Sequence, residues 1–406
     1  MNFKAISLAA ASAALCLAAV SCDKKNDLGG LSASEKEMKN IVEQYVPGVV
    51  YATYGDLAKE TGELYDLLAA AAEGGVKTLT QAQLDAICAK FLQARQSWEE
   101  SEAFLFGAAS DFGIDPHIDT WPLDVDGLAT ELSNAEKVES LRGEDGIAYA
   151  AAKLGQELLG FHGIEFVLFR DGKNRTLASL MANESDPAFK SKVTGEEELI
   201  YATAVAGDLR DKCFQLEVAW RGESAAKAHQ DRVEECEFET QIGSFFYGEH
   251  IFKATQAGSI YNSWQEVLVA IFDAGCSNIA NEVANTKMGL AYTGEDPNYI
   301  ESPYSKKSFV DFYDNVMSIK NSLYGGINLS TPAKKSAIDL LKTYNTPLAG
   351  SMEAAISGAL AALQNCQAGT AFVDDPRAAK VKAAMDAINH LDEQLAAAAT
   401  WASTIK

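Results

Sequence analysis

Apolar residues recur along most of the chain at the three-to-four-residue spacing of helices that bury one face. The clearest case lies near the carboxyl end, at Val381, Met385, Ile388, Leu391 and Leu395. Sustained alternation of apolar and polar residues, which is typical of strands, is nearly absent from the sequence. The pattern therefore predicts an all-α protein.

Capping and breaking residues divide this pattern into separate helices. Ser34 is a candidate cap for the first helix, and Thr80 and Thr194 each begin a capping box. Pro47-Gly48 predicts a kink, and Asp375-Pro376 predicts the cap and first residue of the last helix. We expect an irregular stretch at 110–126 and helices at 34–72, 80–106, 147–170, 194–221, 259–286, 308–324, 333–345, 347–367 and from 376 onward.

The predicted helices fall into two sets of about four, separated by a charged stretch that also contains glycines. Two helical bundles packed with a cleft between them are the simplest arrangement that buries their apolar faces. We expect an N-terminal bundle at 34–221, a connector at 222–257 and a C-terminal bundle at 258–406. The length is sufficient for two cores of ordinary size.

The chain begins with a short apolar segment of the kind that directs export. This segment follows Lys4 and ends at Ser21-Cys22, a small residue followed at once by cysteine, which is typical of lipoprotein processing. We expect a signal peptide at 1–21, acyl chains on Cys22 that anchor the protein to a membrane, and a tether at 22–33. The anchor would place the protein in the cell envelope, outside the cytoplasm, at the outer membrane or the periplasmic face. The alternative is an ordinary signal peptide with an incidental cysteine.

The charge and the cysteines of the chain limit the kinds of partner and of stabilising site that we expect. The formal net charge is −23 at pH 7, so nucleic acid is not an expected partner, whereas cations are attracted at long range. Five cysteines remain after Cys16 and Cys22, and their odd number and wide spacing argue against a zinc cluster or a dense disulfide framework. One or two disulfides are an alternative that the sequence leaves open. Cys88 and Cys276 lie in apolar helical patterns, however, and are expected to be buried free thiols. No segment after the signal peptide is expected to cross a membrane.

His162 and Glu165 are the strongest candidates for chemistry. Their spacing of three residues places both side chains on one face of a helix, where they can converge on one ion. Apolar residues surround the pair, and a buried carboxylate needs a cation or strong donors. The alternatives are a solvated His–Glu pair or a core histidine with satisfied hydrogen bonds. Glu99 and Glu102 repeat the spacing one helix earlier, where the alternative is an outer charged face with Arg95 paired to Glu99.

The loop after these glutamates adds oxygen ligands and an aromatic wall. Asp119 and Asp124 flank Trp121, although either aspartate could instead form a turn or cap a helix. Conventional hydrolytic motifs are missing from the sequence: H-E-x-x-H does not occur, and H-x-x-E-H fails because Phe166 follows Glu165. The sequence also has no G-x-S-x-G motif, P-loop or dinucleotide-binding glycine fingerprint.

Four segments together resemble the imelysin family, once classed as M75 peptidases. They are Gly160-x-His162-x-x-Glu165, Trp98-x-x-x-Glu102-Ala-Phe-x-Phe-Gly107, Asp119-Thr-Trp-Pro-Leu-Asp124 and Glu301-Ser-x-Tyr-Ser305. The resemblance spans most of the mature chain and implies two helical bundles with a site near their interface. It also implies a link to iron uptake, because the family includes iron-regulated lipoproteins and is related to the periplasmic component of ferrous-iron transporters.

The resemblance places the family's histidine and glutamate at His162 and Glu165, and its acidic positions at Glu102 and Asp119. Glu99 matches the related iron-transport domain. Around the cleft the implied lining is Trp121, Asp124, Ser302 and Tyr304. One departure is Gly163, where relatives often carry alanine or a longer residue.

Three functions stay open on this reasoning. The first is a lipoprotein that binds a metal ion, iron or zinc among others, and acts with partner proteins in iron uptake; imidazole and carboxylate ligands suit several such ions. The second is a metallopeptidase in which the ion activates water and a carboxylate acts as base. The third is an interaction protein that binds a haem-related or peptide partner in the cleft without a metal.

Overall fold

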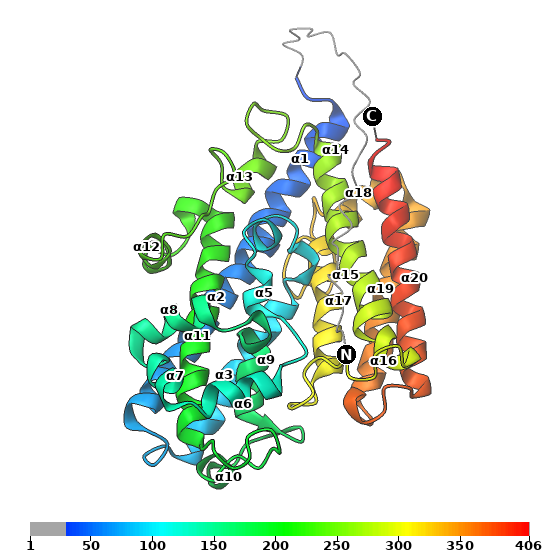
Figure 1. Ribbon diagram of the computed structural model, residues 1–406. Coiled ribbons are helices and arrows are strands. Elements are labelled where there is room, and N and C mark those ends of the chain that lie inside the picture. The colour runs from blue at the N-terminus through cyan, green and yellow to red at the C-terminus, as the bar shows by residue number, and fades with distance from the viewer. Residues whose placement is uncertain (1–29, 406) are drawn as a thin grey trace, which may run out of the picture.

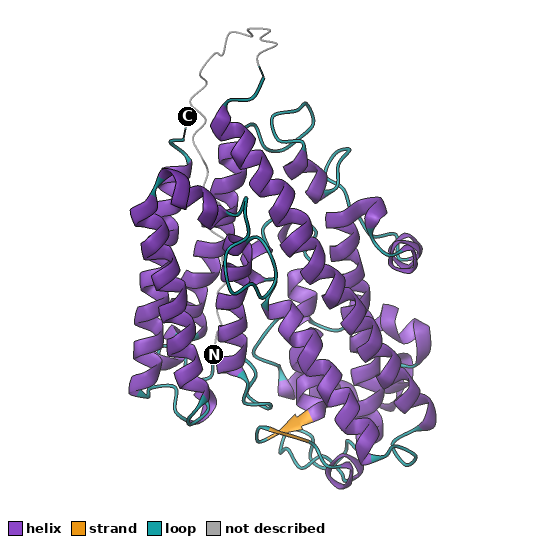
Figure 2. Ribbon diagram, turned by 180° about the vertical axis from the view of Figure 1, so that it is seen from behind, coloured by secondary structure: helices purple, strands orange, loops and turns teal. Residues whose placement is uncertain are grey.

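Helices make up most of the computed structural model, which describes residues 30–405 (Figure 1). The predicted signal peptide at 1–21 and the lipidation site at Cys22 lie outside the described residues. Figure 2 shows the strands of the described region as one short hairpin, β1 (Phe169–Arg170) paired antiparallel with β2 (Lys173–Asn174). The predicted all-α class is therefore confirmed.

The first half of the chain packs around one long buried helix, α11 (Gly195–Arg221), which contacts α2 (Tyr51–Gly74), α8 (Gly143–Lys153) and α9 (Gly160–Leu168). On the other side of α2 lies α3 (Gln81–Glu99). The shorter helices are α4 (Ala108–Asp111), α5 (Asp115–Ile118), α6 (Val125–Leu132), α7 (Ala135–Ser140), α10 (Leu177–Met181), α12 (Lys227–Glu235) and α13 (Tyr247–Phe252). The last two helices lie within the stretch expected to be a connector.

The second half begins with a continuous helix over 264–293 that alternates between α and π geometry. Its parts are α14 (Trp264–Val269), a π segment (Ala270–Ser277), α15 (Asn278–Glu282), a second π segment (Val283–Lys287) and α16 (Gly289–Thr293). The other helices of this bundle are α17 (Ser308–Tyr324), α18 (Ala337–Tyr344), α19 (Thr346–Gln367) and α20 (Ala379–Ala402). The apolar residues first noted at 381–395 lie on the buried face of α20.

One helix in the described region, Trp264–Thr293, is long and apolar enough to cross a membrane by length and composition, which the sequence reasoning did not foresee. In its most apolar window, 56% of the residues are buried inside the protein. The helix contacts α20, and α15 also contacts α17. Its apolar residues therefore contribute to the core of the second bundle.

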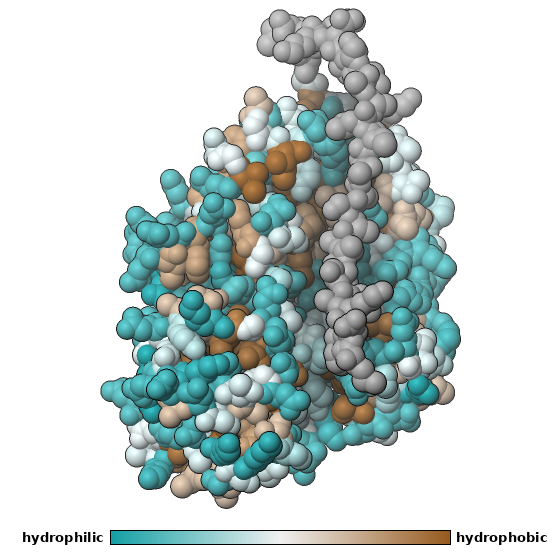
Figure 3. Space-filling model, viewed as in Figure 1, coloured by the Kyte–Doolittle hydropathy of each residue, from teal (hydrophilic) through white to brown (hydrophobic). Residues whose placement is uncertain are grey.

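The two bundles lie side by side and share a contact surface (Figures 1 and 2). The first helix, α1 (Ala33–Tyr45), contacts α14 and α18 of the second half, and α3 contacts α17. Most of the buried apolar side chains of both halves belong to one connected cluster. Polar side chains cover much of the face shown in Figure 3, as expected for a strongly acidic chain. The junction between bundles is thus part of the core.

Two of the four predicted helix starts follow the predicted capping chemistry. Thr80 and Thr194 both form the expected capping boxes. The first helix is instead capped by Ser32, with Glu35 completing the box, so the predicted cap at Ser34 was wrong by two residues. Pro47 lies in a π segment, Val46–Val50, that joins α1 to α2 without a break. The last helix begins at Ala379 after an N-cap at Ala378, so the prediction that Asp375 caps it and Pro376 begins it was wrong.

Two predicted helices are shorter than expected, and both changes affect the candidate site. The helix predicted to reach 106 ends at Glu99, so Glu102 lies on a separate 3₁₀ turn, Glu102–Phe104. The helix predicted over 147–170 is divided, and His162 lies in the first turn of α9. Gly160 has a φ of +66°, and a Cβ there would lie 2.0 Å from the carbonyl oxygen of Ile118. This close approach brings the C-terminal end of α5 against the start of α9.

All five cysteines in the described region are free thiols. Cys88 and Cys276 are fully buried, as their apolar surroundings predicted. Burial raises the pKa of Cys88 to about 12, so its thiol stays protonated at neutral pH. These two cysteines therefore act as small apolar core residues.

Replacing Gly160 with alanine should destabilise the protein by about 2–4 kcal/mol, because the side chain meets a backbone oxygen and the left-handed conformation is unfavourable for alanine. Gly358 in α19 provides the matched control, since a Cβ there has no neighbour within 4 Å. Gly358→Ala should stabilise the protein by about 0.5–1 kcal/mol. Chemical denaturation measures both changes, and equal effects for the two variants would contradict the role given to Gly160.

Candidate metal site at the junction of the two bundles

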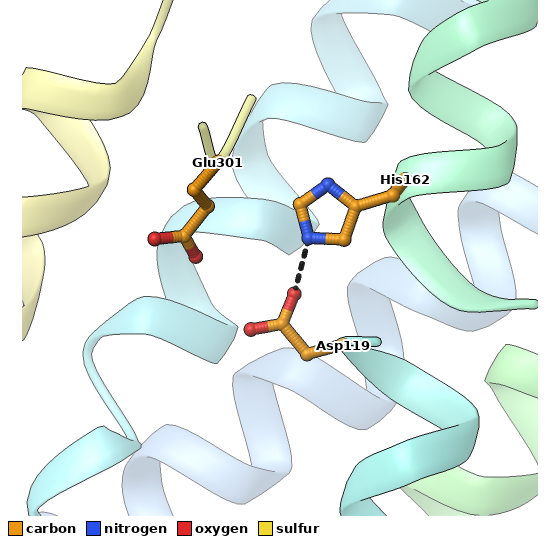
Figure 4. Close-up of side chains that lie close together, drawn as sticks. All are labelled: Asp119, His162 and Glu301. Carbon is orange, nitrogen blue, oxygen red and sulfur yellow. Dashed lines mark hydrogen bonds and ion pairs between the residues drawn. The ribbon is translucent and has the colours of Figure 1, made fainter. Parts of the chain in front are cut away.

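Asp119 is the centre of a buried polar cluster between the bundles. It directly follows α5, and its side chain accepts hydrogen bonds from Arg95, from Trp98 Nε1 at 2.9 Å and from His162 Nε2 at 2.9 Å. Figure 4 shows Asp119 and His162 in contact, with the Glu301 side chain approaching from the second half of the chain. The structure thus brings the predicted residues Asp119 and His162 together.

Arg95 connects this cluster across the junction. Its guanidinium pairs with Asp119 and Glu99 from the first half and with Glu301 from the second, at 2.5 Å between Nη2 and Oε1. Asp311 Oδ2 lies 3.8 Å from the same nitrogen. The Arg95–Glu99 pair considered from the sequence therefore exists, but it is buried and does not form an outer charged face. The side chain of Arg95 is 4% exposed.

Lys287 is a second buried cation, and the sequence reasoning did not single it out. Its ammonium lies 3.2 Å from Glu301 Oε1, 3.7 Å from Glu102 Oε1 and 3.9 Å from Glu99 Oε2. It is the last residue of the second π segment, in a helix whose neighbouring positions are mostly apolar. A lysine within such an apolar stretch was the available signal, because an unpaired lysine is rarely buried.

His162 and Glu165 are both buried and lie on the same side of α9, as predicted, but they occupy different positions around the imidazole. Glu165 Oε2 lies 3.9 Å from Nδ1 of His162, whereas Nε2 faces Asp119. The other oxygen, Oε1, accepts a hydrogen bond from the backbone N–H of Ser305 at 2.7 Å. Glu165 therefore orients the ring from its far side, the arrangement in which a carboxylate supports a metal-binding histidine.

Among residues 30–405, three groups of side chains place ligand atoms within 4.8 Å of one another. They are Asp119 with His162 and Glu301, Glu99 with Glu102 and Asp119, and Glu99 with Glu301 and Asp311. Glu301 and Asp311 were not predicted as ligands, although Glu301 begins a segment that carried the family resemblance. Only the first group combines an imidazole with carboxylates from both halves of the chain.

Burial and the nearby cations shift the pKa values of the carboxyl groups in this cluster in opposite directions. Burial alone would raise the pKa of Asp119, but Arg95 and His162 outweigh burial and hold that pKa well below its usual range. Burial raises the pKa of Glu99 and of Glu102 well above the ordinary value, against the opposing effects of Arg95 and Lys287. It also raises the pKa of Asp311 to about 7. The cluster therefore holds more carboxyl groups than its two permanent cations can neutralise.

His162 is held in its protonated form by its neighbours. Burial would lower the pKa of His162, but the hydrogen bond with Asp119 and the nearby Glu165 carboxylate outweigh that effect and raise the pKa to about 9. Because this value exceeds the ordinary value of 6.5, protonation stabilises the folded state below about pH 6.5. That contribution is lost as the pH rises through about 9.

A pocket of about 320 Å³ reaches this cluster at His162. Trp121 and His162 line it from the first half, and Tyr304 and Val373 line it from the second. Trp121 and Tyr304 thus have the positions expected for cleft-lining residues. The remaining lining residues are Pro122, Leu123, Pro297, Asn298, Ile300 and Pro303.

Asp124 and Ser302 do not line this pocket. Asp124 is exposed and caps α6 by accepting a hydrogen bond from the N–H of Gly127 at 2.9 Å, the alternative recognised from the sequence. Ser302 is 4% exposed and donates a hydrogen bond to Asp311. Its φ of +50° lies in the left-handed region. Ser302 therefore supports the acids beneath the pocket.

A sequence profile of the imelysin family, described as peptidase family M75, matches residues 50–397. The chain belongs to the imelysin family. The expectation drawn from the four resembling segments is thereby confirmed. The match includes every candidate ligand of the cluster, from Glu99 to Asp311.

Known relatives agree with this membership. Iron-regulated protein A of Synechococcus elongatus is 24% identical over 275 residues, which make up 68% of this chain and 61% of that protein. The match therefore covers less than two thirds of this relative. A Parabacteroides distasonis crystal structure, provisionally named an iron-regulated protein A precursor, superposes with a TM-score of 0.73 at 24% identity. It covers 92% of this chain and 96% of its own.

The crystal structure of an imelysin-like protein from Psychrobacter arcticum also shares the fold. Its TM-score is 0.59 at 14% identity, and the match covers 93% of this chain and 99% of the other.

Gly163, the departure noted in the family motif, has a local explanation in this chain. A Cβ at this position would lie 2.1 Å from the hydroxyl of Tyr201, which donates a hydrogen bond to the carbonyl of Leu158.

Asp119→Asn should lower the pKa of His162 from about 9 to below 6.5, because the substitution removes the carboxylate that stabilises the imidazolium while burial persists. It should also destabilise the protein by about 3–5 kcal/mol by leaving buried cations underpaired. Histidine ring resonances in a titration followed by NMR measure the pKa, and the chain has only five histidines to assign. An unchanged His162 pKa in the variant would contradict the pairing.

Proposed function

We propose that this imelysin-family protein binds a metal ion, with iron favoured, at His162, Asp119 and Glu301 in the junction between its bundles. The observation that supports this most directly is the convergence of one imidazole and two carboxylates, buried and drawn from both halves of the chain. Imidazole and carboxylate ligands suit iron, manganese and zinc.

Among the described residues, a candidate ligand atom that makes no hydrogen bond also favours a bound ion. Glu301 Oε2 is buried without a hydrogen-bond partner in the structure. Leaving such oxygens unsatisfied is costly, and coordination to a cation would compensate for that cost. Glu165 would keep the imidazole oriented while Nε2 binds the ion.

The ion is proposed as cargo in iron acquisition, which follows from the relatives named iron-regulated protein A. Export and lipid anchoring at Cys22 would place the site outside the cytoplasm, facing incoming ions, where partner proteins of iron uptake could receive them. Peptide hydrolysis is less well supported. The sequence has neither H-E-x-x-H nor H-x-x-E-H, the motifs of conventional zinc peptidases.

Isothermal titration calorimetry on the protein from residue 23 onward tests the proposal, with Zn²⁺ in air and Fe²⁺ without oxygen. The wild type should bind one ion, and His162→Ala should weaken binding at least about tenfold because it removes the only imidazole of the ligand set. His390→Ala is the matched control, since His390 lies on the exposed surface of α20 with a side chain 59% exposed. It should bind as the wild type does.

Equal binding by wild type and His162→Ala would rule out this site. A peptide library incubated with the metal-loaded protein separates binding from hydrolysis. We expect no cleavage above the His162→Ala background. Cleavage that disappears in Glu165→Gln would instead identify a metallopeptidase.

A further inference from the structure

Lys287 places a permanent positive charge among carboxylates that resemble a cation-binding set. Its ammonium is surrounded by Glu99, Glu102 and Glu301, and Lys287 is 1% exposed. The lysine enters the cluster from the second bundle, at the end of the π segment Val283–Lys287. Such π segments often occur where a helix directs a side chain into a functional position.

The contacts of this ammonium are loose compared with those of Arg95. Of the three carboxylates, Glu301 alone lies within hydrogen-bond distance, at 3.2 Å. Glu102 and Glu99 lie at 3.7 and 3.9 Å, which is too long for a hydrogen bond. An ammonium carries three donors, so this arrangement of acids does not match its geometry closely.

The same carboxyl groups have oxygen atoms that are available to bind a cation. Glu301 is fully buried, and its Oε2 atom has no hydrogen-bond partner in the described structure. Glu99 and Glu102 offer ligand atoms within 4.8 Å of Asp119 and of each other. Buried carboxylate oxygens in such a group suit a hard divalent cation better than a single tethered ammonium.

We infer that Lys287 occupies a second cation position, formed by Glu99, Glu102 and Glu301, and competes there with a divalent metal ion. The inference rests on the proposed function in one respect, because Glu301 belongs to both positions. In the wild type the lysine limits the junction to one ion. Removing its charge opens the second position.

Lys287→Met tests this inference, with Mn²⁺ as the probe. Calorimetry and the EPR signal of free Mn²⁺ both count the ions bound per chain. The variant should bind one ion more than the wild type, because the acids lose their tethered cation and gain attraction for a mobile one. Without Mn²⁺ its melting temperature should fall, and Mn²⁺ should raise that temperature by more than it does in the wild type.

Two further variants serve as controls. Lys287→Arg keeps the charge and should bind no additional ion. Lys382→Met removes a lysine from the exposed face of α20, where its side chain is 51% exposed, and should match the wild type. An additional ion in Lys287→Arg or in Lys382→Met would overturn the inference.

The outcomes separate this inference from the proposed function. If the wild type binds no ion but Lys287→Met binds one, the proposed function fails and the second position stands. If both bind one ion and the variant binds no more tightly, Lys287 is a structural counter-ion and the inference fails. Should Lys287→Met not fold, Lys287→Gln retains a donor for Glu301. Folding of either variant that depends on Mn²⁺ supports the inference, and misfolding that Mn²⁺ does not rescue overturns it.

Discussion

The structure depends on the neutralisation of the carboxylates buried at the junction between the bundles. Arg95 provides most of this neutralisation, because its guanidinium contacts Asp119 and Glu99 in the first bundle and Glu301 in the second. Each of these carboxylates would be costly to bury alone. The two halves must therefore meet in one register, with the loop after α16 lying against α3. The position of His162 beside Asp119 follows from the same register.

Much of the fold could be predicted from the sequence, because apolar spacing and capping residues act locally. The helix beginning after Thr194 and the apolar stripe of α20 illustrate this. The predictions failed where a distant backbone decides the local geometry. Nothing in the residues near Gly160 reports that Ile118 approaches it, so the break before α9 was not visible.

The candidate site was predicted only in part, because some of its features depend on local spacing and others on residues far apart in the sequence. His162 and Glu165 have a helical spacing that can be read directly, and Glu99 and Glu102 have the same spacing. Asp119 lies in the loop expected to supply oxygen ligands, and the family resemblance supported both Glu102 and Asp119. Which nitrogen of His162 faces which carboxylate could not be predicted, because Ser305 and Asp119 fix the ring from two separate loops. Lys287 and Asp311 lie in different helices. The approach of Lys287 to Glu301 depends on the packing of the π segment, and that of Asp311 to Arg95 on the packing of α17.

The division of the ligand set between the two halves has a further consequence. Asp119 and Glu301 are far apart in sequence, and an ion held by both would close the long loop of chain between them. A closure of that length restricts the unfolded chain strongly, as a disulfide between the same residues would. A bound ion would therefore act as a reversible cross-link, and the release of cargo would also loosen the hold of one bundle on the other.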